Sequence, residues 1–139
     1  MTAVKDIRPG LRAYLLADGA IAALIGPRMF PSILPQGINA PSLVYQRISG
    51  FGDHHMQGPS GYAVARVQVR AWSLNLETSE GLANLVKGRL DGFRGTFGSG
   101  PTAVRVLGIF YEQENPPDFD TGRSLHGIGR DYMIHYQER

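Results

Sequence analysis

The 139-residue sequence contains no cysteine, only two lysines and no long hydrophobic run. Without cysteine the chain can form neither a disulfide nor a zinc or iron–sulfur site held by thiolates, which fits a reducing compartment. No apolar stretch approaches the roughly 20 residues that cross a bilayer, and the polar first ten residues lack the apolar region of a signal peptide. We therefore expect a protein that is assembled in the cytoplasm and makes no contact with a membrane.

Positive charge is present but is not concentrated. The formal net charge is +2 and the isoelectric point is about 9.2, and Lys5 and Lys87 are the only lysines among 14 basic residues. Proteins that bind nucleic acid through a dedicated surface usually cluster lysine and arginine. The scattered arginines of this chain therefore give little support for sequence-specific DNA binding.

Glycine and proline are abundant, with 18 and 9 residues. They lie between periodic segments rather than in low-complexity tracts, which predicts long ordered loops. The length is close to the commonest size of one domain, so we expect a single domain over residues 1–139.

Periodicity predicts three helices and four strands. The helices cover residues 4–15, interrupted or started by Pro9, then 18–26 with Asp18 as the N-cap, and 76–90 with Asn75 as the N-cap. The strands cover residues 42–49, 62–73, 102–114 and 123–136. Two hairpins with helices on one face make an α+β domain with a mostly antiparallel four-stranded sheet.

The segment 50–61 carries two adjacent histidines, His54 and His55, next to Asp53. Zinc ligands usually stand two to four residues apart or at helical spacing, and this pair has neither arrangement. His126 and His135 lie an odd number of residues apart on one predicted strand, so they face opposite sides of it. We interpret 50–61 as a solvated, mobile loop that meets a partner, with a small metal-dependent enzyme built on His54 and His55 as an alternative.

Other reactive patterns are equally weak. Ser60 lies between a glycine-rich loop and a strand, the reverse of a nucleophile elbow. The acidic residues around the end of the third strand are typical of a solvated hairpin: Glu112, Glu114, Asp118 and Asp120. No catalytic, cofactor-binding or metal-ligating residue is assigned, and we expect no enzyme.

The strand 62–73 has two different faces. One face is small and apolar, and the other carries Arg66, Gln68, Arg70 and the only tryptophan, Trp72. Tryptophan and arginine are enriched in protein interfaces, so this face predicts a contact between subunits. Charge reversal at Arg66 or Arg70 is expected to leave the monomer folded and to weaken assembly.

The helix 76–90 contains Gly81 and Gly88 on one side, with Asn84 between them. Each interior glycine costs a helix about 1 kcal/mol relative to alanine. The pair indicates either close approach of another element or a helix that tolerates them.

The order of several fragments resembles the tail-completion, or tail-terminator, family of long-tailed phages and gene transfer agents, long described only as a family of unknown function. The fragments are "LRAYLLADGAIAALIGPRMFPSILPQG", "PSLVYQRIS", the histidine loop ending in "GPSG", "ARVQVRAW" and "LDGFRGT". Two features depart from that family's pattern: Pro9-Gly10 interrupts a helix expected to be continuous, and Arg70 occupies a position that is often acidic.

The resemblance implies a structural virion protein without a cofactor, assembled in the bacterial host. It implies a homo-oligomeric ring, hexameric in related proteins, that caps the head-proximal end of the tail tube and stops its polymerisation. The implied partners are the tail tube protein, the head–tail connector or stopper protein, and genomic DNA that passes through the lumen without sequence-specific binding. A head-completion or adaptor protein of the neck is the alternative within the same class.

Residues expected to contact a neighbouring subunit, the tube or the connector follow from these features. They are Phe51, His54, His55, Met56, Gln57, Arg66, Gln68, Arg70, Trp72, Gly81, Asn84 and Gly88. The competing expectation for Arg66 and Arg70 is that they face the lumen and touch DNA phosphates.

Overall fold

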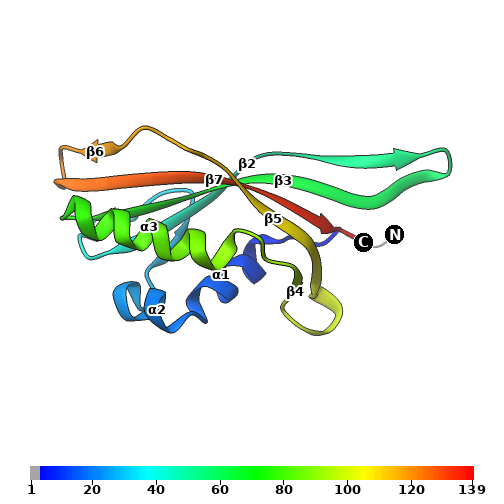
Figure 1. Ribbon diagram of the computed structural model, residues 1–139, viewed down its shortest axis with the longest axis horizontal. Helices are drawn as coiled ribbons and strands as arrows, with labels where there is room; N and C mark the ends of the chain where they lie inside the picture. The colour runs from blue at the N-terminus through cyan, green and yellow to red at the C-terminus, as the bar shows by residue number, and fades with distance from the viewer. Residues whose placement is uncertain (1–3) are drawn as a thin grey trace.

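The computed structural model describes residues 4–139, apart from the side chains of His54, His55 and Pro59. Figure 1 shows three α-helices on one face of an elongated sheet. The elements, in chain order, are α1 (Arg8–Leu16), α2 (Gly19–Ile25), β1 (Met29–Pro31), β2 (Ser42–His55), β3 (Gly58–Ser73), α3 (Leu76–Leu90), β4 (Gly95–Phe97), the 3-10 turn η1 (Gly100–Thr102), β5 (Val104–Glu114), β6 (Asp118–Asp120) and β7 (Leu125–Gln137).

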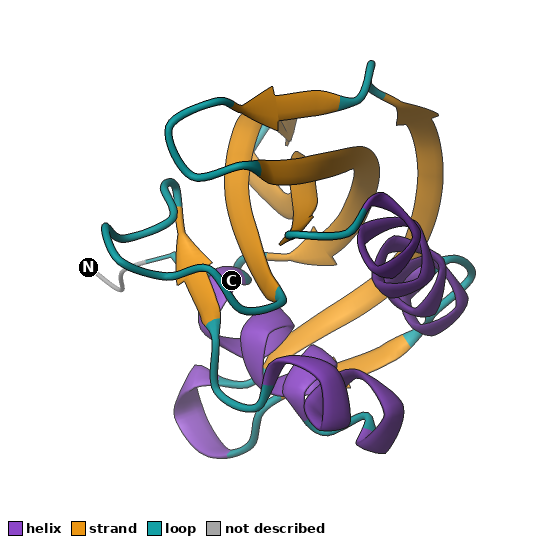
Figure 2. Cartoon of the chain, turned by 90° about the vertical axis from the view of Figure 1, so that its left-hand side faces the viewer, coloured by secondary structure: helices purple, strands orange, loops and turns teal. Residues whose placement is uncertain are grey.

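The sheet is larger than the sequence suggested and is mixed. Its strand order is β1-β2-β3-β7-β5-β4, with β6 added to β7. The α+β class and the helices on one face are confirmed, but the expectation of four strands is wrong: the described residues form seven, and β1 runs parallel to β2. Figure 2, seen from the left-hand end of Figure 1, shows that the sheet curves strongly around its long axis.

The three additional strands are short and lie in segments rich in proline or glycine. β1, β4 and β6 have three residues each and fall within regions that the sequence predicts as connectors or turns. Such strands have no periodicity of their own, because they form by pairing with the edge or end of a long strand.

The segment 50–61 is not a loop, which corrects the sequence expectation. β2 and β3 continue through it as a hairpin, with His55 opposite Gly58 and a two-residue turn at Met56 and Gln57. Gly58 closes the turn at a φ of 125°, a conformation that other residues rarely adopt. The strand signal was hidden because glycine, histidine and proline replace the alternating β-branched residues there.

Helix α1 begins at Arg8 with Pro9 in its first turn, so the proline starts the helix rather than kinking it. A side chain at Gly10 would collide with Phe97 of β4, since its Cβ would lie 2.4 Å from the Phe97 Cβ. Pro9-Gly10 therefore allows α1 to begin close against β4. The predicted N-caps of the other helices are confirmed, because Asp18 accepts hydrogen bonds from Ala20 and Ile21, and Asn75 accepts one from Glu77.

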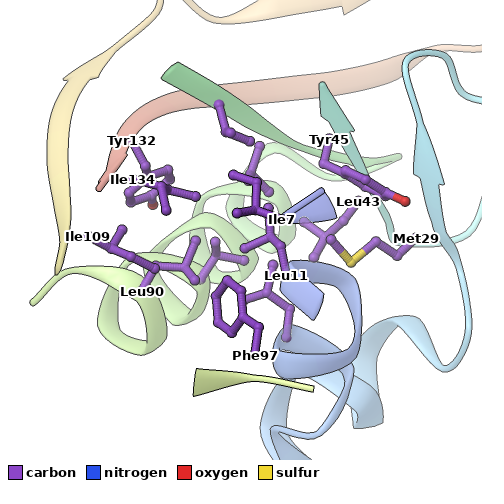
Figure 3. Close-up of a cluster of buried hydrophobic side chains, with 14 of the residues drawn as sticks. Ile7, Leu11, Met29, Leu43, Tyr45, Leu90, Phe97, Ile109, Tyr132 and Ile134 are labelled. Atoms are coloured by element: carbon purple, nitrogen blue, oxygen red, sulfur yellow. The ribbon is translucent and has the colours of Figure 1, made fainter. Parts of the chain in front are cut away.

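The main core lies between the helices and the small apolar face of β3. Figure 3 shows how side chains from all layers meet there, including Leu11 of α1, Leu90 of α3 and Ile134 of β7. Leu85 of α3 is 36% exposed and lies outside this core. The helices thus pack on one face of the sheet and leave the opposite face without helices (Figure 1).

Candidate assembly surfaces

The face of the sheet opposite the helices carries the predicted Arg66, Gln68, Arg70 and Trp72. They alternate along β3 and stand opposite the same-face residues of β7, where Gln68 pairs with Asp131. All four are only partly exposed. The structure therefore brings this predicted set together on one surface.

Asp131 of β7 is the centre of this surface and is only 4% exposed. Its carboxylate accepts hydrogen bonds from Arg66 at 3.0 and 2.8 Å, from Gln68 at 3.4 Å and from Asn115 at 2.8 Å. A buried carboxylate is tolerated only when such partners compensate for its lost hydration. Arg66 is therefore committed to an internal ion pair.

The part of this face nearest β6 is hollowed into a basin of about 450 Å³. Its lining comes from the connector after β1, from β2 and β3, and from the β6 region: Ser32, Ile33, Leu34, Val44, Gln46, Gln68, Arg70, Trp72, Asp118, Asp120 and Arg123. Leu34, Val44 and Leu125 form a small second core against Trp72. Arg123 holds the connector in place by donating to the carbonyls of Pro35 and Leu34.

The walls of the basin depend on two glycines of β7. A Cβ at Gly127 would lie 2.8 Å from the Trp72 ring, and one at Gly129 would lie 2.9 Å from the Arg70 guanidinium. Trp72 and Arg70 therefore lie flat across β7. Arg70 reaches the Asp118 carboxylate at 3.6 Å, and Arg123 reaches that of Asp120 at 3.5 Å.

The hairpin formed by residues 52–61, here called the arm, projects beyond the end of β7 (Figure 1). Met56 at its turn is fully exposed, and Phe51 at its base is 62% exposed. Within the arm, the Ser60 hydroxyl donates to the carbonyl of Asp53 at 3.1 Å. Gln57 lies in the same turn, and the side chains of His54 and His55 lie outside the described part of the chain.

The third predicted set lies on the outer side of α3. Gly81, Asn84 and Gly88 are exposed, and no atom lies within 4 Å of where a Cβ would stand on either glycine. Asn84 accepts a hydrogen bond from Arg130 at 2.8 Å, and Arg130 also pairs with Glu114. No described element of the chain therefore makes the close approach that the glycines suggested, so either a partner approaches them or the helix simply tolerates them.

The predicted contact residues thus occupy three separate surfaces: the outer sheet face, the arm and the outer side of α3. The sequence missed Asp131, Asn115 and the connector residues of the basin. One signal was available, because glycine alternates with larger residues in "GIGRD" (127–131), which indicates that neighbouring side chains cross over this strand.

Reactive chemistry has little support in the described residues. No three described side chains of histidine, aspartate or glutamate lie close enough together to hold a metal ion. His135 packs edge-on against Phe110 and hydrogen-bonds the hydroxyl of Tyr62, while His126 lies against Phe119.

The resolved pKa shifts have structural causes. The hydrogen bond from Arg8 lowers the pKa of Asp6, and burial raises the pKa of Tyr132 well above its usual value. Neither group lies in a cluster of other titratable side chains suited to catalysis.

Comparison with known proteins decides the family. The sequence profile described as tail completion protein gp17 matches residues 9–100, about two thirds of the chain. The chain belongs to this tail completion family. The tail completion protein is therefore a structural protein of the phage tail and a component of the virion.

The fold has a close counterpart among solved structures. A chain from the structure titled "Virion of native gene transfer agent (GTA) particle" superimposes with a TM-score of 0.75 over 94% of both chains, at 15% sequence identity. At this identity the likeness concerns the fold. No curated protein matches the sequence, and no helix within residues 4–139 is long and apolar enough to cross a membrane.

Proposed function

We propose that this tail completion protein forms a ring, hexameric in its complete state, on the head-proximal end of the tail tube. The ring stops tube polymerisation and presents a surface to the head–tail connector. The match of residues 9–100 to the tail completion family carries this proposal. The fold likeness to a chain of a gene transfer agent particle supports it.

The distribution of exposed features agrees with a protein that has several partners. A ring subunit needs two different surfaces for its neighbours and two more for the tube and the connector. The chain offers the outer sheet face, the arm and the glycine side of α3, which point in different directions. We assign the α3 side, with Gly81, Asn84 and Gly88, to the tube protein or the connector.

DNA passes through the lumen of the proposed ring without sequence-specific contacts. Arg66 pairs with the buried Asp131, and Arg70 lies beside Asp118 and across Trp72. Arginines that already have carboxylate partners gain little from phosphate, so these two residues do not form a phosphate-binding track. The subunit interface is the better assignment for this face.

Imaging of purified protein tests the ring. We expect negative-stain images with six-fold symmetry and a central hole, and a hexamer mass in native mass spectrometry. When added to polymerising tail tube protein, the rings should sit at one tube end and limit tube length. A strictly monomeric protein beside capped tubes would overturn the ring, and a protein that binds connectors but not tubes would favour the adaptor alternative.

The remaining alternative, an enzyme that uses His54 and His55, predicts bound metal. Metal analysis of purified protein, compared with a variant in which both histidines are replaced by alanine, separates the two classes. Membership in a family of structural tail proteins favours the metal-free result.

A further inference from the structure

We propose that neighbouring copies join head to tail, with the arm of one copy seated in the basin of the next. This inference rests on the proposed ring and names the two surfaces that meet in it. The occupant of the basin is therefore a second copy of this chain.

The arm and the basin lie at opposite ends of the elongated molecule. In Figure 1 the arm extends to the right beyond β7, while β6, which borders the basin, lies at the far left. A chain cannot place its own arm in its own basin at this separation. Contact between two different surfaces repeats from copy to copy, which closes into a ring when the rotation permits.

The apolar side chain at the tip of the arm matches the apolar part of the basin. The arm presents Met56, an unbranched and adaptable side chain that is fully exposed to water. The basin offers about 450 Å³ with Leu34, Val44 and Trp72 at its apolar part and Ile33, 75% exposed, at its rim. The volume exceeds one methionine side chain, so the Met56 side chain can enter.

The arm has few stabilising contacts within its own chain. Beyond the end of β7 it is a ribbon of two strands, and an isolated two-stranded hairpin is marginally stable in water. It extends about 15 Å past the last pairing with β7, at roughly 3.3 Å per residue. Docking in a neighbour would supply the contacts that the ribbon lacks in one chain.

Charge divides along the same axis. The end that carries the arm has six basic and three acidic residues, a balance of +3: Lys5, Arg8, Arg47, Arg94, Arg105 and Arg139 against Asp6, Asp53 and Glu138. The end that carries the basin is only slightly acidic, with six acidic and five basic side chains, a balance of −1: Glu77, Glu80, Glu112, Glu114, Asp118 and Asp120 against Arg12, Arg28, Arg70, Arg123 and Arg130.

Strand register places several of these residues at the two ends. Arg105 lies opposite Gln137 at the base of the arm, and Asp118 and Asp120 lie opposite Gly127 and Leu125. Within the described residues Arg47, Arg94 and Arg105 have no ion-pair partner, since every salt bridge found there involves other side chains. The basic excess at the arm end disfavours contact between two arm ends, and the small acidic excess at the basin end favours head-to-tail approach.

Cross-linking tests the contact directly, because the natural chain has no cysteine. We would mix a Met56→Cys protein with an Ile33→Cys protein, allow rings to form and add a short bismaleimide. We expect a covalent dimer only when both variants are present. A chain carrying both substitutions should give a ladder of products up to the full ring.

The matched control pairs Met56→Cys with Leu85→Cys, an exposed position on the outer side of α3. This pair should give no dimer above background. Rings that form without a cross-link between positions 56 and 33, or with an equal yield for the Leu85 pair, would overturn the inference and leave the proposed ring intact. Absence of any ring would overturn both.

A second variant measures the strength of the contact. Met56→Asp places a charge at the turn without touching the core, and we expect the concentration needed for half-maximal ring formation to rise at least tenfold. Leu85→Asp, the matched surface change, should leave it unchanged, and both should show the native circular dichroism spectrum. An unchanged assembly curve for Met56→Asp would contradict the inference.

Discussion

At the scale of single residues, Asp131 determines which side chains of the outer sheet face are held in internal contacts. Its carboxylate is buried and holds Arg66, Gln68 and Asn115 in one network. The sequence suggested that reversing the charge of Arg66 would leave the monomer folded. The structure changes this expectation, because Arg66→Glu would place a second carboxylate beside a buried one.

Replacing Asp131 by asparagine should destabilise the monomer. The change removes the negative charge that balances Arg66, whose side chain is 26% exposed and so retains part of its hydration. We expect a loss of about 2 kcal/mol in the free energy of unfolding, below the range for fully buried pairs. Urea unfolding measures it.

Asp118→Asn is the control, since Asp118 is 59% exposed, lies 3.6 Å from the Arg70 guanidinium and otherwise accepts one exposed hydrogen bond, from the backbone N–H of Phe119 at 2.9 Å. It should cost no more than about 0.5 kcal/mol. Equal losses for the two variants would show that the Asp131 network is not a special feature of this face.

At the scale of elements, the same residue type serves opposite purposes in α1 and α3. Gly10 lets α1 lie against Phe97, whereas Gly81 and Gly88 face open space. A glycine in a packed position is required by sterics, while an exposed one only lowers helix propensity. The helix with exposed glycines is therefore stable through its buried side, with Leu82, Val86 and Leu90.

Alanine substitution at a packed and at an exposed glycine should change the free energy of unfolding in opposite directions. Gly10→Ala should destabilise the protein by about 1–3 kcal/mol, because the new Cβ meets Phe97. Gly88→Ala should stabilise it by about 0.5–1 kcal/mol through helix propensity. Thermal or urea unfolding of both monomers gives the comparison, and two changes of the same sign would refute the steric account.

The arm is the element whose environment should change most on assembly. Its amide hydrogens are held only by pairing between two strands, so residues 52–61 should exchange quickly in the monomer. In assembled rings the exchange should slow as the arm becomes covered. Hydrogen exchange of both states by mass spectrometry tests this, with α3 residues Leu82–Val86 as the internal reference; equal and fast exchange of the arm in both states would reject it as a contact.

At the scale of the whole molecule, shape and charge share one axis. The arm end is basic, the basin end is slightly acidic, and the helices lie on one side of the sheet toward the basin end (Figure 1). An electrically polar, elongated subunit orients its neighbours before any close contact forms.

Ring assembly should therefore depend on salt. Between about 0.05 and 0.5 M salt the Debye length falls from well above to well below 10 Å, so the attraction between unlike ends is screened. We expect the association rate to fall, with a smaller effect on dissociation. Light scattering after rapid dilution measures the rate, and an unchanged or increased rate would show that charge does not guide assembly.

The sequence by itself determined the three helices, their caps, the four long strands and the two faces of β3. These are local properties, since helix periodicity, capping side chains and strand alternation are written in neighbouring residues. The order of its fragments also pointed to the correct family. The composition argued against thiolate-held metal sites, because the chain has no cysteine, and against a membrane-spanning helix, because it has no long apolar run.

Only the tertiary structure decided the remainder. β1, β4 and β6 exist because long strands offer them pairing partners, and 50–61 is an arm because β2 and β3 continue to pair where their own strand signals fade. The basin joins residues more than 80 positions apart, and Asp131 meets Arg66 across 65 positions. Such contacts depend on which strands become neighbours, and that choice is made by burial of the whole core and not by any local stretch of sequence.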